Sequence, residues 1–328
     1  MNSASAERMP LPRVSVGVPV RNGAKYLEQT LDDLLNQTMD DLEVVVCDNC
    51  STDRTPALLE SIRRRDDRVR VHRNQTDLGP AANYDAVLQM ARADLFCWSA
   101  ADDRHAPDFL ARAVSALDAD PTAVLATVGV RRIGPDGQDL GRVDGEPDMS
   151  SEDPSERLRN LIFVDHRRHG AHELFGLARR KTLRACGPQG AYARSDSVTL
   201  ARLVLRGRFT RIEDELFFNR DHGERSSRVN PPRGWHDRGW AVHVLGGGPS
   251  PPDSWWDPSR AGSMVWPEWK LLREYVRAVE EAPLTLEERG RCRRVLATFA
   301  ARHVPKLTRD VLIGAEFCVR RAADRGAS

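Results

Sequence analysis

The chain has 328 residues, which is enough for one large α/β domain or for one domain with an extension, and we favour the second arrangement. Its 49 Lys and Arg residues balance 48 Asp and Glu residues, so the charge does not favour nucleic acid or an acidic polymer as a partner. No apolar run approaches the roughly 20 residues of a membrane helix, and the N-terminus lacks the apolar segment of a signal peptide. The six scattered cysteines fit a reducing compartment, and we therefore expect a cytoplasmic protein.

The first 130 residues alternate apolar, β-rich runs with helical patterns. The expected strands span residues 14–20, 42–47, 69–72, 95–99 and 123–128. This alternation is typical of an α/β fold whose mostly parallel central sheet carries helices on its faces.

Three helices are expected between these strands. The first has leucines at i, i+4, i+7 and i+8 from residue 27, a stripe that packs on a sheet. The second starts with Thr55 as N-cap and Pro56 in the first turn. The third packs closely through a stripe of mostly small residues, namely Ala82, Ala86, Val87 and Met90.

The second half is less regular. Residues 129–154 are rich in turn formers and predict a hairpin or loop, and helices are expected at 155–163, at 197–206 and from 269 to the end. Residues 230–267 are rich in Pro, Gly and Trp; the tryptophans either stack on a sugar or an apolar aglycone, or pack the extension. We therefore predict a nucleotide-binding domain over 1–228 and a helical C-terminal extension over 229–328. The basic C-terminal helices present either a solvated face or a surface for peripheral contact with an anionic membrane.

Polar residues follow three of the expected strands. Ligands of an open parallel sheet bind at the carboxyl ends of its strands, so these residues are candidates for a site. No G-x-G-x-x-G or G-x-x-x-x-G-K-[ST] motif is present, and the strand ends offer Asp48, Asp102 and Asp103 instead. Carboxylates suit a divalent metal that bridges a diphosphate, although Asp102 and Asp103 are equally explained as a turn and helix cap.

Two segments resemble the family 2 glycosyltransferases of the GT-A fold. They read PVRNGAKYLEQTLDDLLNQTMDDLEVVVCDNCSTDRT and NQTDLGPAANYDAVLQMARADLFCWSAADD, and the similarity covers roughly residues 12–225. The resemblance implies an inverting enzyme that transfers a sugar from a nucleoside diphosphate sugar, with a UDP- or TDP-sugar favoured, to a hydroxyl acceptor on a polysaccharide, a lipid-linked intermediate or a secondary metabolite.

The resemblance also implies roles for individual residues in donor binding. Asp48 matches the acidic residue that contacts the nucleobase or ribose, whereas Asp53 is expected to cap the following turn. Asn74 and Asn83 match an element that faces the nucleotide; a turn asparagine and a buried helix amide explain them equally well. The first nucleotide-contacting loop is matched by Pro19, Arg21 and Asn22.

The metal motif departs from the D-x-D pattern of most relatives. Ala100 and Ala101 precede Asp102, which aligns with the metal ligand, so we still expect Mn²⁺ or Mg²⁺. Residues 219–227 resemble the family's closing element. His222 is the candidate there for approaching the metal or phosphates, assisted by Arg220 or Arg225, and a charged surface loop is the alternative.

An inverting transfer needs a base for the acceptor hydroxyl proton. Asp196 precedes an expected helix where relatives carry their catalytic Asp, and an ordinary N-cap is the alternative. Glu173 and Asp214 are the nearest competitors for this role.

Other patterns and functions carry less weight. Cys47 and Cys50 lack a second pair at zinc-finger spacing, and the histidines at 166, 169 and 172 fit a loop along the acceptor cleft better than a metal site. Alternative functions on the same fold are a nucleotidyltransferase and a non-catalytic module that binds a sugar nucleotide.

Overall fold

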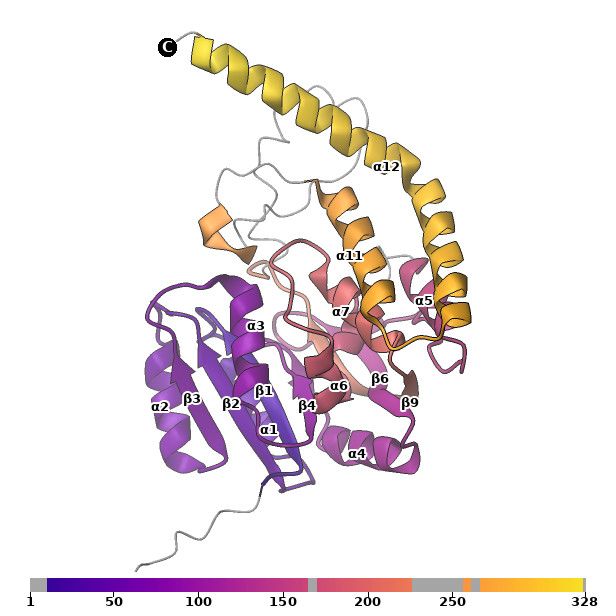
Figure 1. The fold of residues 1–328 in the computed structure, drawn as a ribbon. Coiled ribbons are helices and arrows are strands. Elements are labelled where there is room, and N and C mark those ends of the chain that lie inside the picture. The colour runs from indigo at the N-terminus through magenta and orange to yellow at the C-terminus, as the bar shows by residue number, and fades with distance from the viewer. Residues whose placement is uncertain (1–10, 165–169, 226–255, 261–265, 327–328) are drawn as a thin grey trace, which may run out of the picture.

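The structure is a computed structural model that describes residues 11–164, 170–225, 256–260 and 266–326 (Figure 1). Within these residues the strands form one sheet in the order β3-β2-β1-β4-β8-β6-β9-β5, and β7 pairs with β6. The first four strands are β1 (Val14–Val20), β2 (Leu42–Asp48), β3 (Val69–Arg73) and β4 (Leu95–Trp98). The others are β5 (Arg104–His105), β6 (Ala123–Ile133), β7 (Asp139–Arg142), β8 (Leu177–Arg179) and β9 (Arg208–Arg220).

The half of the sheet that holds the site is parallel. β1 pairs in parallel with both β2 and β4, and β2 pairs in parallel with β3, so the carboxyl ends of these strands lie at one edge. The other half is mixed: β8 is antiparallel to β4 and β6, while β9 is parallel to β6 and antiparallel to β5. The predicted mostly parallel sheet is confirmed.

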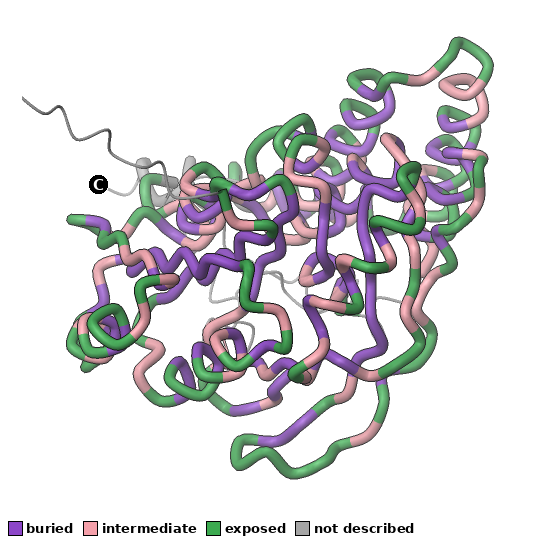
Figure 2. The backbone as a smooth tube through the Cα atoms, turned by 90° about the horizontal axis from the view of Figure 1, so that it is seen from below, coloured by how far each residue is buried: buried purple, intermediate pink, exposed green. Residues whose placement is uncertain are grey.

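Helices cover both faces of the sheet and bury two apolar clusters. The helices are α1 (Leu27–Leu35), α2 (Thr55–Arg65), α3 (Gly79–Met90), α4 (Phe109–Ala119), α5 (Pro154–Ile162), α6 (Arg180–Ala185), α7 (Ser195–Val204), α11 (Pro267–Glu281) and α12 (Leu286–Gly326), with short 3-10 helices η1 (His172–Phe175) and η3 (Pro258–Arg260). Residues of α1, α2 and α4 form one cluster, and residues of α3, α5, α7, α11 and α12 form the other. Figure 2 shows the buried chain following the strands and the inner sides of these helices.

Several predicted boundaries differ from the observed ones. β6 continues to Ile133 because it pairs with β9 and β7 along its length. Thr55 is the first residue of α2, not its N-cap, since its backbone N–H donates to Asp53 Oδ1 at 2.9 Å. In the predicted stripe of α3, Val87 is buried and Ala86 and Met90 pack against the core, but Ala82 is exposed and Ala81 is buried in its place. Asp196 lies inside the first turn of α7, so the N-cap interpretation is wrong.

The C-terminal helices belong to the second apolar cluster. α11 and α12 contribute Tyr275, Val279 and Phe299 to the cluster that also contains Val198 and Leu200 of α7. In Figure 1, the C-terminal part of α12 projects away from the sheet. No helix among the described residues is long and apolar enough to span a bilayer. The predicted domain boundary at 228/229 lies outside the described residues, and so do Trp235, Trp240 and Trp255.

Candidate active site

A pocket of about 620 Å³ opens at the carboxyl ends of β1, β2 and β4. Six of the predicted site residues line it: Pro19, Arg21, Asn22, Asn83, Asp102 and His222. Its wall also includes Gly23, Lys25, Tyr26, Asn49, Asp53, Asp77, Pro80, Tyr84, Ala100, Ala101 and Glu224. The strand-end rule therefore places the site correctly.

The loop after β1 is held to the loop after β2 by backbone hydrogen bonds. Asn22 has a left-handed backbone (φ 54°), a conformation that asparagine tolerates better than most residues. Its N–H donates to Ser51 Oγ at 2.8 Å, and its Oδ1 accepts from the N–H of Thr52 at 2.8 Å. Asp53 accepts from the N–H groups of Ala24 and Thr55, so its predicted capping role is confirmed.

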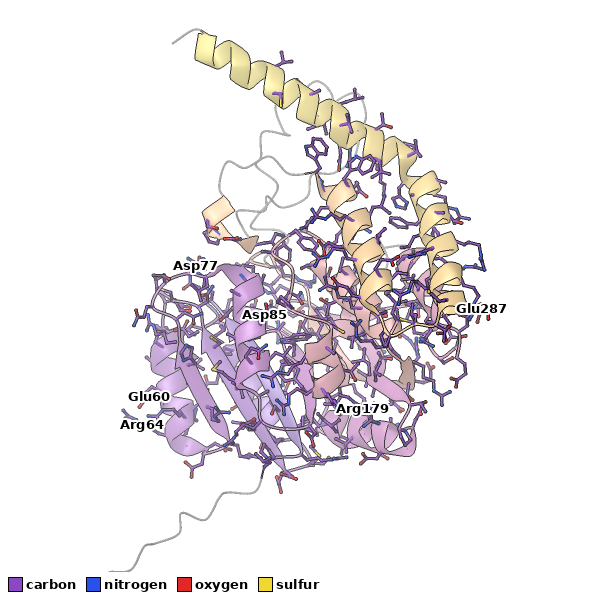
Figure 3. All side chains as sticks on the ribbon, in the orientation of Figure 1. Glu60, Arg64, Asp77, Asp85, Arg179 and Glu287 are labelled. Carbon is purple, nitrogen blue, oxygen red and sulfur yellow. The ribbon has the colours of Figure 1, made fainter. Side chains whose placement is uncertain are left out.

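Asp77 lines the pocket. Figure 3 shows it beside the N-terminal end of α3. Its carboxylate accepts hydrogen bonds from Asn49 Nδ2 at 2.7 Å and from the N–H of Gly79 at 2.9 Å. Arg21 Nη2 lies 3.3 Å from its second oxygen. Our sequence reasoning missed Asp77 and Asn49, although an Asp two residues before a Gly-Pro helix start is a recognisable capping signal.

An asparagine network forms the floor of the pocket. Asn74 Nδ2 donates to Asn49 Oδ1 at 3.0 Å and to Asn83 Oδ1 at 3.3 Å. Asn83 Nδ2 donates to the carbonyl of Cys47 at 3.0 Å. Asn83 still lines the pocket, whereas Asn74 does not. The buried-amide interpretation therefore accounts for both asparagines, and Asn83 combines it with access to a ligand.

Asp48 lies behind the pocket surface. Its side chain is 1% exposed, and one carboxylate oxygen accepts from the N–H of Ser51 at 3.0 Å. The other oxygen lies 3.5 Å from Arg73 Nε. Asp48 thus orders the turn that presents Asn49 and Ser51, and it does not itself line the pocket.

Asp102 and His222 meet in the lining of the pocket. β5 and β9 are antiparallel with Arg104 opposite Phe218, so the residues before β5 meet those after β9. His222 Nε2 lies 2.9 Å from Asp102 Oδ2, and the imidazole packs against the Tyr26 ring with centroids 4.7 Å apart. The long-range pairing of two strands therefore joins residues 120 positions apart in the sequence.

Arg220 is placed differently from our prediction. The side chain is fully buried, with Nε donating to the carbonyl of Asp102 at 2.8 Å and Nη1 to that of Pro135 at 2.8 Å. Its guanidinium also stacks over Tyr26. Because these donors are occupied by protein groups, Arg220 supports the Asp102 loop from behind and does not face a phosphate site. Arg225 is half-buried and also lies outside the pocket lining.

Asp103 is a buried support of the same loop. It accepts from the backbone N–H of Arg220 at 2.7 Å and from Asn219 Nδ2 at 3.2 Å. Burial and the neighbouring Asp102 carboxylate raise the pKa of Asp103 to about 7, and the two hydrogen bonds oppose this rise. The second Asp of the pair is therefore structural.

Asp196 does not itself line the pocket, but it is close enough to Tyr84, a lining residue that our sequence reasoning missed, to influence the pKa of the Tyr84 hydroxyl. Burial raises the pKa of the Tyr84 hydroxyl, and the carboxylates of Asp102, Asp103 and Asp196 add to the rise. The Tyr84 hydroxyl thus lies in a field set by all three carboxylates, and Tyr84 itself lines the pocket. Burial also raises the pKa of Asp196, whose Oδ1 accepts from the N–H of Ser197 at 2.7 Å.

The competing base candidates are elsewhere. Asp214 is exposed on β9 and pairs with Arg112. Glu173 lines a separate, narrow cavity with His172 and Phe175. Neither lines the main pocket.

The cysteine and histidine patterns do not form a metal centre in the described part of the chain. Cys47 is buried, Cys50 is partly exposed, and both are free thiols. His166 and His169 lie outside the described residues. No group of three or more His, Cys, Asp or Glu side chains is placed to hold a metal among the described residues. Among the described residues, Asp102 and His222 therefore form a pair and not part of a larger metal-binding group.

The comparison with protein families is decisive. Residues 15–183, just over half of the chain, match the family described as glycosyl transferase family 2. The chain belongs to this family. The predicted family and the predicted GT-A fold are confirmed.

Individual relatives of this family 2 glycosyltransferase share part of their length with it. A chondroitin synthase of Pasteurella multocida is 29% identical over 156 residues, which are 48% of this chain and 16% of the synthase. A GalNAc(5)-diNAcBac-PP-undecaprenol beta-1,3-glucosyltransferase of Campylobacter jejuni is 32% identical over 108 residues, 33% of this chain and 34% of that enzyme. The crystal structure of S. aureus TarS 1-349 in complex with UDP-GlcNAc has a TM-score of 0.60 at 18% identity, covering 89% of this chain and 72% of that one.

Proposed function

We propose that this glycosyltransferase inverts the anomeric centre as it moves a sugar from a nucleoside diphosphate sugar, with a UDP-sugar favoured, to a hydroxyl acceptor. The observation that carries the proposal is the pairing of Asp102 with His222 in a pocket that Arg21, Asn22 and Asn49 also line. The family relationship and the UDP-GlcNAc complex of TarS support this donor class. A cytoplasmic location and a polysaccharide, lipid-linked or secondary-metabolite acceptor remain part of the proposal.

The residues present fit a divalent cation held jointly by protein and donor. Mg²⁺ and Mn²⁺ are bound in many such sites by one or two protein ligands and by substrate phosphates. Asp102 and His222 would hold the ion, which supplies positive charge to the leaving diphosphate. Because these two atoms now contact each other, a cation bound by both would replace their hydrogen bond.

Asp196 is proposed as the base. It accepts the proton of the acceptor hydroxyl while that oxygen bonds to the anomeric carbon and the bond from this carbon to the diphosphate breaks. Burial raises its pKa, which brings a carboxylate closer to the range of an effective base at neutral pH. Asp48 is proposed to act on the nucleoside end by ordering the turn that carries Asn49 and Ser51. Arg225, close enough to Asp103 to influence its pKa, is proposed to assist the diphosphate.

The experiment measures UDP release from a panel of UDP-sugars with Mn²⁺ or EDTA, in wild type and in Asp196→Asn. We expect release that needs the cation and falls by about 10³-fold in the variant, while UDP still stabilises the folded protein. Asp214→Asn, a matched change of an exposed carboxylate, should leave release unchanged. Proton NMR of the first sugar released from an α-linked donor should show the β-anomer; the α-anomer would refute inversion.

A further inference from the structure

Helix α7, which carries Asp196, packs against helix α11 of the C-terminal extension. Both helices lie after residue 183, where the segment that matches the family ends. Three contacts join α7 to α11, and they advance in the same direction along both helices. Arg194 pairs with Glu268 at 3.7 Å, Arg202 with Glu274 at 3.1 Å, and Arg206 Nη2 reaches the carbonyl of Glu281 at 3.5 Å. α11 and α7 therefore run parallel, and α11 accompanies α7 from its first residue.

The first of these contacts is at a backbone position under strain. Arg194 has a left-handed backbone (φ 67°) directly before Ser195, the first residue of α7, and Asp196 follows. A non-glycine residue keeps this conformation only where its surroundings hold it. Glu268 is the residue of α11 that pairs with Arg194, and its own backbone is fixed because its N–H donates to Asp310 Oδ2 of α12 at 2.7 Å.

A buried tyrosine of α11 faces the same turn. Tyr275 is fully buried and lies beside Asp196 and Ser197, yet its hydroxyl makes no well-formed hydrogen bond to any described residue. Burial raises the pKa of this hydroxyl to about 12, and the carboxylate of Asp196 contributes, so the group stays neutral and keeps its proton at physiological pH. Tyr275 therefore presents a neutral hydroxyl to the first turn of α7, close to Ser197 and to the carboxylate of Asp196.

We propose that α11 sets the position of the proposed base, with Glu268 acting through Arg194 and Tyr275 acting on the carboxylate of Asp196. Glu268, Arg194 and Tyr275 are positioning residues, since none of them lines the donor pocket. The proposal rests on the proposed role of Asp196. It makes the C-terminal extension a functional part of the site and assigns it the acceptor side of the reaction, because α11 packs on α7, whereas the donor pocket is lined by residues before 103 together with His222 and Glu224.

The test compares Glu268→Gln and Tyr275→Phe with Glu280→Gln, a matched control. Glu280 lies on the same helix but pairs with Arg293 of α12 and not with α7. The first readout is hydrogen exchange of the full-length protein. Glu268→Gln should raise exchange of the amides of residues 194–199 about fivefold, as loss of a half-buried ion pair predicts, and should leave the pocket loops after β1 and β2 unchanged. Unchanged exchange at 194–199, or an equal effect in the control, would overturn the proposal.

The second readout is UDP release from the UDP-sugar that the wild type uses. Both variants should lower kcat about tenfold with an unchanged KM for the donor, because a misplaced base slows the chemical step and not donor binding. Double replacement Arg194→Gln/Glu268→Gln should match either single change. If Asp196→Asn is inactive but both α11 variants keep full kcat, the role of α11 is refuted and Asp196 remains the proposed base. If Asp196→Asn keeps full kcat, Asp196 is not the base, and the role of α11 is refuted as well.

Discussion

Replacing Asp102 with Asn tests the cation site most directly. Asp102 supplies the one carboxylate of the Asp102–His222 pair, so the variant should lose the stabilisation that depends on both cation and nucleotide. A ligand at 100 times its Kd stabilises the native state by about 2.7 kcal/mol. For 328 residues, with an unfolding entropy of about 2.1 cal/mol/K per residue, this corresponds to a rise in Tm of about 4 °C.

The assay is thermal unfolding with UDP, Mn²⁺, both or neither. Wild type should show the full shift only with both ligands, and Asp102→Asn should show none beyond the effect of UDP alone. Without ligands the variant should lose about 1 kcal/mol at most, because Asp102 is partly exposed and its pair with His222 is screened. Glu224→Gln, which removes a carboxylate from the same pocket, should keep the shift. A full Mn²⁺-dependent shift in Asp102→Asn would refute the cation site.

Three further predictions concern stability. Gly79→Ala should destabilise the protein by more than about 2 kcal/mol in urea unfolding, because at φ +78° a Cβ there would lie 2.3 Å from the Trp256 carbonyl oxygen. The control Gly137→Ala, at φ +85° in open space, should lose only the ~1 kcal/mol of backbone strain. Equal losses in the two variants would contradict the contact. Arg220→Ala should lose about 3 kcal/mol of stability, because it leaves buried carbonyls unpaired. Arg225→Ala should change stability by under about 0.5 kcal/mol and weaken UDP binding. The reverse pattern would make Arg225 the structural residue and Arg220 the one that assists the diphosphate. Burial raises the pKa of Asp85 to about 6, so the contribution of Asp85 to stability should fall as pH rises from about 4 to 6. Relative to wild type, Asp85→Asn should gain roughly 1 kcal/mol at pH 8 and nothing at pH 3.5, and a pH-independent difference would refute this.

The parallel half of the fold could be predicted because its signals are local. Strands β1 and β2 are buried on both faces and read as continuous apolar runs, and the polar residues at their ends follow directly. Asn22, Asn83 and Asp102 could therefore be placed from the sequence, with the family resemblance to choose among them. The local sequence around Asp53 likewise predicts the capping role that the structure shows for this residue.

Long-range pairing hides the remaining features. Arg220 reads as a surface cation, and only the pairing of β5 with β9 reveals that it is buried against the Asp102 loop. Tyr84 sits on a helix whose stripe is mostly small residues, so nothing local marks its hydroxyl as a neighbour of Asp196. The role of Glu268 depends on how α11 packs on α7, and no motif before residue 230 encodes that contact.

The candidate site uses residues of the segment that matches the family and residues that follow it, so relatives can vary in one part and keep the other. The matched segment ends at residue 183, yet the proposed base, at 196, and His222 both come after it. The donor pocket thus uses loops that follow strands of the matched segment, whereas α7 is packed by α11 and α12 into an apolar cluster that includes Tyr275 and Phe299. Changes in the C-terminal helices can shift α7 without disturbing β1 or β2, because the loops after those strands are held by their own hydrogen bonds. Variation in acceptor use is therefore expected to map to the extension, and variation in nucleotide use to the loops after β1 and β2.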